Sequence, residues 1–138
     1  MATRHLLTVM CLLCVLLHGC AYDRSGSYVR KLVIEGTDGQ RLSLRDAHAI
    51  ANSLIANGVL DSVQTRFPQL KRYGATRFLI RAGVYNTSGD SEDETYLKLC
   101  IQCDNGLKSA EEHASDFQLA LDYEESLATR MMTRWAAE

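Results

Sequence analysis

The chain has 138 residues, of which 46% are hydrophobic and 23% are charged, with a formal net charge of −2, five cysteines and one proline. This length suits one domain rather than two. The apolar fraction and the single proline exclude a disordered or low-complexity chain. The near-neutral balance argues against a nucleic-acid partner, because nucleic-acid-binding domains carry a clear excess of basic side chains.

The first 20 residues have the organisation of an export signal. Arg4 precedes a run of twelve uncharged residues, 6–17. A membrane-spanning helix needs about 20 apolar residues, so this run is too short to span and instead has the length of a signal-peptide core. We therefore expect a signal peptide at 1–19, a short tether at 20–27 and a single globular domain at 28–138.

The end of the leader, Leu17-His18-Gly19-Cys20, resembles the lipobox of bacterial lipoproteins. The resemblance implies that the thiol of Cys20 receives a diacylglycerol, that cleavage occurs just before it, and that the new amine is acylated. His18 departs from the family pattern, in which a small residue is usual. Cleavage after Ala21 would instead give a soluble periplasmic protein. Because Ala21 is not the aspartate that retains many lipoproteins at the inner membrane, the resemblance favours an outer-membrane anchor facing the periplasm.

The remaining chain predicts an α+β fold with a small antiparallel sheet of three or four strands, helices on one face and a long C-terminal helix. Residues 28–35 are rich in β-branched and aromatic side chains, which indicates a strand, and residues 40–44 are expected to return as a second short strand. Ser43 and Asp46 approximate a capping box at the start of a helix that ends at Gly58.

Four further elements follow. A helical stretch begins near residue 60 and must be interrupted at Pro68, which lacks a backbone N–H. Residues 76–85 and 95–103 alternate in side-chain character and predict an antiparallel hairpin. The strand–helix–strand–strand–helix order resembles, at the level of fold, the small ring-building domains of bacterial secretion machines.

The last helix is expected over about residues 110–136, after a capping box formed by Ser109 and Glu112. Its apolar stripe is broken by Glu124. At 1.5 Å per residue such a helix would be about 40 Å long. It must therefore bend, break or project towards a partner.

Charge is divided unevenly along the sequence. Residues 20–88 carry ten basic and five acidic side chains, whereas residues 89–138 carry four basic and twelve acidic ones. This asymmetry either steers association or cancels when the two halves interleave.

Two further sets of residues are candidate binding surfaces. Met131 and Trp135 near the end of the last helix either contact a partner or cover the sheet. The densest basic stretch is a candidate binding surface or an ordinary solvated surface, and consists of Arg66, Lys71, Arg72, Arg77 and Arg81.

Cys100 and Cys103 are the only cysteines after Cys20. The pair is compatible with a disulfide, with two separate thiols or with a redox pair. A zinc site is a fourth alternative, in which His113 and an acid such as Glu112 would supply the other ligands. A redox pair normally lies at a helix N-terminus, whereas this motif ends a strand. Residues three apart in a regular strand face opposite sides, so a disulfide requires the strand to turn first.

No catalytic motif stands out. His48 and His113 lack the sequence signatures of a nucleophilic triad. The acidic loop lacks the ligand order of a calcium-binding EF-hand, and its carboxylates are Asp90, Glu92, Asp93 and Glu94.

The sequence therefore predicts a non-enzymatic, membrane-tethered envelope lipoprotein that binds a protein partner or assists assembly. Such a protein would be an accessory of a secretion or conjugation apparatus, or an inhibitor of an envelope enzyme. No metal or cofactor is assigned, and no nucleic acid is expected. The alternative is a small periplasmic metal- or thiol-dependent protein centred on Cys100, Cys103 and His113.

Overall fold

The computed structural model describes residues 9–11, 21–23, 26–36, 38–85, 94–104 and 108–138. Three long strands form an antiparallel sheet with β5 at its centre, and two short strands pair with β3. The strands are β1 (Val9–Cys11), β2 (Ala21–Asp23), β3 (Ser27–Gly36), β4 (Ala75–Tyr85) and β5 (Glu94–Cys103). The described helices are α2 (Leu44–Ala56), α3 (Val59–Arg66), α4 (Gln69–Arg72), α5 (Lys108–Glu112) and α6 (Ala114–Ala137).

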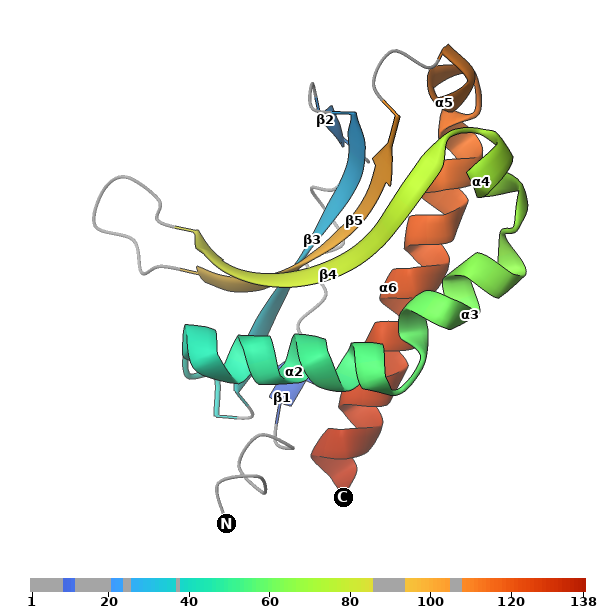
Figure 1. The fold of residues 1–138 in the computed structure, drawn as a ribbon. Helices are drawn as coiled ribbons and strands as arrows, with labels where there is room; N and C mark the ends of the chain where they lie inside the picture. Colours follow the sequence, from blue (N-terminus) through green and yellow to red (C-terminus); the bar gives the residue numbers. More distant parts are fainter. Residues whose placement is uncertain (1–8, 12–20, 24–25, 37, 86–93, 105–107) are drawn as a thin grey trace.

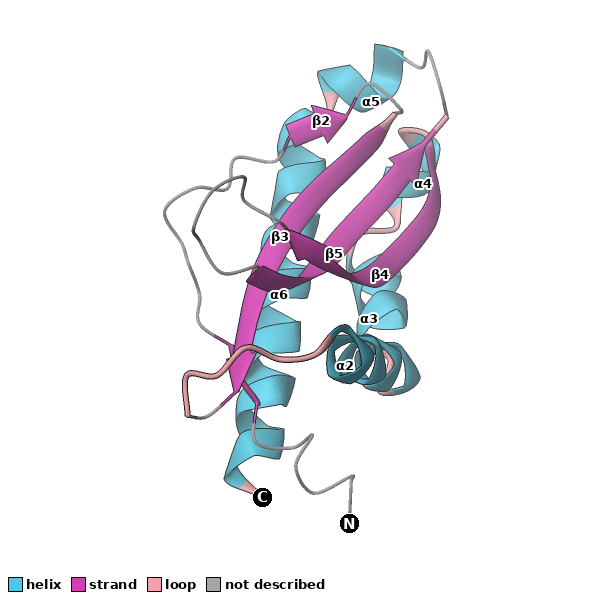
Figure 2. Ribbon diagram, turned by 90° about the vertical axis from the view of Figure 1, so that its left-hand side faces the viewer, coloured by secondary structure: helices cyan, strands magenta, loops and turns pink. Residues whose placement is uncertain are grey.

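The helices gather on one face of the sheet and leave its other face uncovered by any described helix (Figures 1 and 2). Helix α6 packs against β3 and β5, α2 packs against β4 and β5, and α3 lies against α6. The predicted α+β fold, with helices on one face and a long C-terminal helix, is confirmed. None of the described helices combines the length and apolar character needed to cross a membrane.

The core lies between the sheet and the helices. Successive side chains of a strand point to opposite faces of the sheet, so every second residue of β5 faces the helices. Three of these residues, Leu97, Leu99 and Ile101, are completely buried. Tyr28 of β3 stacks on Phe117 of α6 with ring centroids 4.5 Å apart, and its hydroxyl donates a hydrogen bond to a backbone carbonyl of α5. The sheet and the C-terminal helices are thus joined by both apolar and polar contacts.

Three sequence-based element assignments are confirmed. Ser43 caps α2, since its side-chain oxygen accepts a hydrogen bond from the backbone N–H of Asp46 at 3.1 Å. Pro68 separates α3 from α4, as a residue without a backbone N–H should. The hairpin of β4 and β5 also forms, with Tyr85 opposite Glu94 at its loop end.

Two other assignments need correction, and the last helix breaks, which is one of the outcomes that its length predicts. Residues 40–44 form only an isolated bridge to β3, because the Leu42 carbonyl instead accepts a hydrogen bond from the Thr95 hydroxyl and the chain passes directly into α2. The last helix is divided at His113, between α5 and α6. Helix α5 already begins at Lys108, so Ser109 is not its N-cap.

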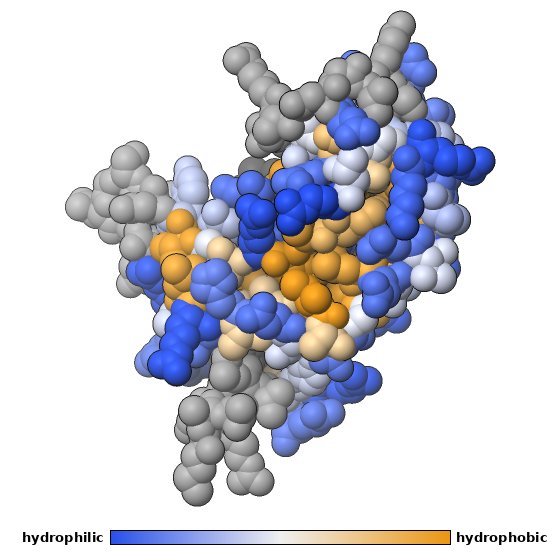
Figure 3. Space-filling model, in the orientation of Figure 1, coloured by the Kyte–Doolittle hydropathy of each residue, from blue (hydrophilic) through white to orange (hydrophobic). Residues whose placement is uncertain are grey.

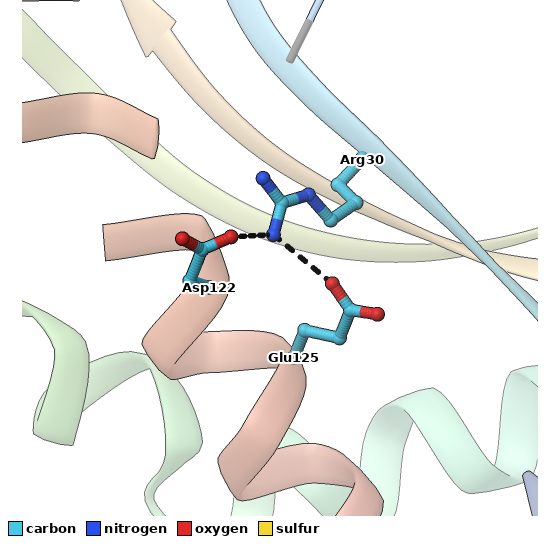
Figure 4. A network of polar contacts seen from close by, with 3 residues as sticks. All are labelled: Arg30, Asp122 and Glu125. Atoms are coloured by element: carbon cyan, nitrogen blue, oxygen red, sulfur yellow. Dashed lines mark hydrogen bonds and ion pairs between the residues drawn. The ribbon is translucent and has the colours of Figure 1, made fainter. Parts of the chain in front are cut away.

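A buried arginine connects β3 to α6 (Figure 4). The side chain of Arg30 is only 8% exposed, and its Nη1 donates hydrogen bonds to carboxylate oxygens of Asp122 and of Glu125, the latter at 3.0 Å. Burial lowers the pKa of Arg30, but the hydrogen bonds and charges of these two carboxylates outweigh burial and leave the pKa above its ordinary value. Arg30 therefore stays charged inside the interface.

Glu124 is a different kind of buried charge. It lies on α6 with no exposed surface, and neither carboxyl oxygen has a hydrogen-bond partner among the described atoms. Burial raises the pKa of Glu124 from 4.5 to about 8, although the positive charge of Arg30 acts in the opposite direction. At neutral pH the carboxyl is therefore mostly protonated, which explains how it interrupts an apolar stripe without breaking the helix.

This pKa predicts that stability depends on pH. The folded state holds a proton on Glu124 that the unfolded chain releases above its ordinary pKa, so the free energy of unfolding falls as pH rises from about 5 to 8, by up to about 1.4 kcal/mol per pH unit. In Glu124→Gln this contribution is absent. Urea denaturation at several pH values should show a shallower decline for the variant, and parallel declines would contradict the assignment.

Candidate binding surface

The face of the sheet opposite the helices, here called the open sheet face, carries three cations in one line. Strand register places Lys31 of β3 directly opposite Lys98 of β5, and Lys98 directly opposite Arg81 of β4. We call these three residues the basic row. Like charges in directly opposed positions destabilise a sheet. The row therefore carries a folding cost that a bound anionic group would relieve.

An apolar row lies beside the basic row. It is formed by Val29, Cys100 and Leu79, which are paired across the same three strands. Cys100 is buried and its two neighbours are half-buried. The exposed parts of Val29 and Leu79 thus offer apolar contact next to positive charge.

Aromatic rings border the basic row on its other side. The Lys31 ammonium lies 4.7 Å from the ring centre of Tyr85 and 4.9 Å from that of Tyr96. Tyr96 faces Gly83 across the β4–β5 pair, and a Cβ at Gly83 would lie 2.6 Å from the tyrosine ring. The glycine therefore makes room for the ring, which with Tyr85 draws the Lys31 charge towards β4.

The basic row has no acidic counterpart in the described part of the chain. Among the described residues, the carboxylates that form ion pairs do so with other groups. Asp122 and Glu125 bind Arg30, and Asp116 lies beside His113. Arg81 is exposed and Lys98 is half-buried, so both are accessible to a partner.

The basic stretch predicted from the sequence is divided between two sides of the molecule. Arg77 and Arg81 lie exposed on the open sheet face, whereas the other three residues lie exposed on α3 and α4, on the helical side. The residues on the helical side are Arg66, Lys71 and Arg72. The Arg66 guanidinium carbon lies 5.1 Å from the ring centre of Tyr123. The fold therefore separates basic residues that lie close together in the sequence.

Met131 and Trp135 are half-buried and pack against the core. They cover the interior more than they present a free surface. Lys31 and Lys98 were not singled out from the sequence. Alternation in residues 95–103 does place Lys98 opposite the apolar side chains, but its alignment with Lys31 depends on a pairing of strands far apart in the chain.

The two cysteines of β5 do not form a disulfide in the structure. Cys100 faces the open side and Cys103 the helical side, because side chains three apart in an extended strand point in opposite directions. Burial, with smaller effects from Cys100 and Asp104, raises the pKa of Cys103 to about 11, which disfavours the reactive thiolate.

The other candidate ligands are also apart. The imidazole of His113 stacks on Tyr73 with ring centroids 3.6 Å apart, and His48 is exposed on α2. The described residues contain no group of three His, Cys, Asp or Glu side chains placed to hold a metal ion. Glu94 is exposed at the start of β5. The remaining predicted residues Cys20, Asp90, Glu92 and Asp93 lie outside the described residues.

Comparison with protein-family models, with curated proteins and with solved structures finds no match. The geometry of the open sheet face is therefore the basis for the functional proposal.

The repulsion within the basic row can be measured. Lys98→Thr should raise the free energy of unfolding by about 0.5 kcal/mol at low ionic strength, because it removes the central charge and keeps a strand-favouring residue. The gain should shrink at high salt as screening increases. Arg77→Thr is the matched control, because Arg77 lies opposite the uncharged Gln102. An equal gain in both variants would show that the row carries no special strain.

Proposed function

We propose that the chain is a membrane-tethered lipoprotein of the bacterial envelope that acts as a non-enzymatic binding module for an acidic protein. The observation that supports this proposal is the basic row, in which Lys31, Lys98 and Arg81 oppose one another without a described carboxylate between them. Complementary charge on a partner removes the repulsion and directs the encounter.

The surroundings of the basic row favour a protein partner over a small anion. An apolar row lies on one side and tyrosine rings lie on the other, so a bound surface gains apolar and aromatic contact as well as charge pairing. Tyrosine and arginine are also the residue types that contribute most to protein interfaces. An accessory role in a secretion or conjugation apparatus remains part of this proposal and rests on the leader and on the order of elements.

The pairing of β2 with β3 bears on the length of the proposed tether. Residues 21–23 form β2, which pairs with residues 27–29 of β3, so half of the stretch 20–27 belongs to the sheet. Gly26, just before β3, has a φ of 83°, a conformation that glycine adopts readily. A lipid on Cys20 would therefore hold the domain close to the membrane.

The anchor is tested by changing single cysteines. Cys20→Ser should move the protein from the membrane fraction to the soluble fraction and abolish incorporation of labelled fatty acid. Cys14→Ser, whose site lies within the proposed leader, should remain membrane-bound and labelled. A Cys20→Ser chain that is processed and retained like the unsubstituted chain would contradict the lipoprotein proposal.

The binding surface is tested by photo-crosslinking in cells. A photoreactive phenylalanine analogue in place of Leu79, beside the basic row, should form an adduct with a protein. Lys98→Glu should strongly reduce that adduct, whereas the matched reversal Lys71→Glu on α4 should leave it unchanged. An adduct that appears only from a probe at the exposed Ser126 of α6, or one indifferent to Lys98→Glu, would contradict binding through the open sheet face.

A further inference from the structure

The outer edge of β4 is the long unpaired edge of the sheet. Along the described strands the order ends with β4, which pairs only with β5 and runs for 11 residues. The opposite edge differs, because β1 and β2 both pair with β3 there. An unpaired edge presents backbone N–H and C=O groups that can bind an additional strand.

The helix-facing side of β4 is incompletely covered. Phe78, Ala82 and Val84 are half-buried, whereas the β5 residues opposite them are almost completely buried. Those β5 residues are Ile101, Leu97 and Thr95. The core therefore extends to the edge of the sheet without closing over it. Figure 3 looks onto this edge and shows apolar residues gathered between β4 and the helices below it.

The other side of the same strand is basic. Arg77 and Arg81 are exposed there, and Arg81 is the end of the basic row at the outer edge. Figure 3 shows hydrophilic residues above β4, opposite the apolar patch. A strand placed beside β4 would have one set of side chains over positive charge and the alternate set over apolar surface.

We propose that β4 binds an extended segment of the partner protein, in which acidic and apolar residues alternate, as an added strand. This inference rests on the proposed binding function and names the chemistry of its partner. The acidic side chains would lie about 5 Å from Arg81 across the new pair and continue the basic row with opposite charge. The apolar side chains would cover Phe78, Ala82 and Val84, and backbone hydrogen bonds would satisfy the edge.

Alternative occupants fit this edge less well. A helix would cover the apolar side chains but leave the backbone groups of β4 unpaired. A second copy of the chain, paired through its own β4, would bring its arginines next to Arg77 and Arg81 and add repulsion. An alternating acidic strand satisfies both the backbone and the charge.

The experiment uses the full chain purified in detergent and three fluorescent peptides of about nine residues, a typical strand length. The first peptide alternates glutamate and valine. The second is identical but N-methylated on every second backbone nitrogen, on the edge that pairs. The third has the same composition with its glutamates in one block. Fluorescence anisotropy should show binding of the first peptide, and at least about tenfold weaker binding of the other two.

Variants of the chain identify the binding edge. Arg81→Glu should weaken the alternating peptide about tenfold, and Val84→Thr, which keeps the shape of the side chain, should weaken it a few-fold. Ser126→Glu on α6 is the control and should have no effect. Circular dichroism verifies that each variant is folded.

The outcomes separate strand addition from the broader binding proposal. If the N-methylated or block peptide binds as tightly as the alternating one, strand addition is wrong, although charge-driven binding to the open sheet face stands. If no peptide binds while the probe at position 79 still forms its crosslink to a protein, the outer edge of β4 is not the binding site. The proposed binding function would survive that result. A dimer of the chain that the peptide dissociates would place a second copy on β4 and would also overturn the assignment.

Discussion

The complete burial of Leu97, Leu99 and Ile101 on one side of β5 is the constraint on which the surface chemistry depends. A one-residue slip of this strand would expose all three and would move Lys98 into the core. The register is therefore fixed by the hydrophobic interior. Strand β5 pairs with β3 on one side and with β4 on the other, and both pairings keep this register. Lys31 and Arg81 must therefore lie on either side of Lys98. Core packing thus enforces the repulsion on the open sheet face.

The helical side contains its own electrostatic compromise. Arg30 occupies a core-facing position of β3, and its guanidinium is turned to Asp122 and Glu125 of α6. Its Nε has no hydrogen-bond partner among the described atoms, and neither carboxyl oxygen of Glu124 has one. Two carboxylates already balance the single positive charge, so ionisation of Glu124 would bury a further uncompensated negative charge. Protonation of Glu124 is the less costly state, and it makes the interface between β3 and α6 sensitive to pH.

The sequence predicted the features that depend on local chemistry. Alternation gave the β4–β5 hairpin, proline chemistry gave the break at Pro68, and the strand period placed Cys100 and Cys103 on opposite sides. The basic row could not be predicted in this way, because Lys31 and Lys98 are brought together by a pairing between strands that are separated in the sequence by three helices and β4. The failed strand at 40–44 has a similar cause, since the hydroxyl of Thr95, distant in sequence, binds the backbone there.

The two edges of the sheet differ in a way that connects the proposed anchor to the proposed partner. The segment next to Cys20 pairs with β3, whereas the unpaired edge belongs to β4, about 15 Å away across three interstrand spacings. A lipid on Cys20 would hold the first edge towards the membrane without blocking the second. The basic row runs across the sheet between them, from β3 to the outer edge of β4. A partner strand added at β4 would therefore extend a line of charge that starts on β3, the strand paired with the segment next to Cys20. A lipid anchor on Cys20 would restrict the orientation in which β4 meets its partner.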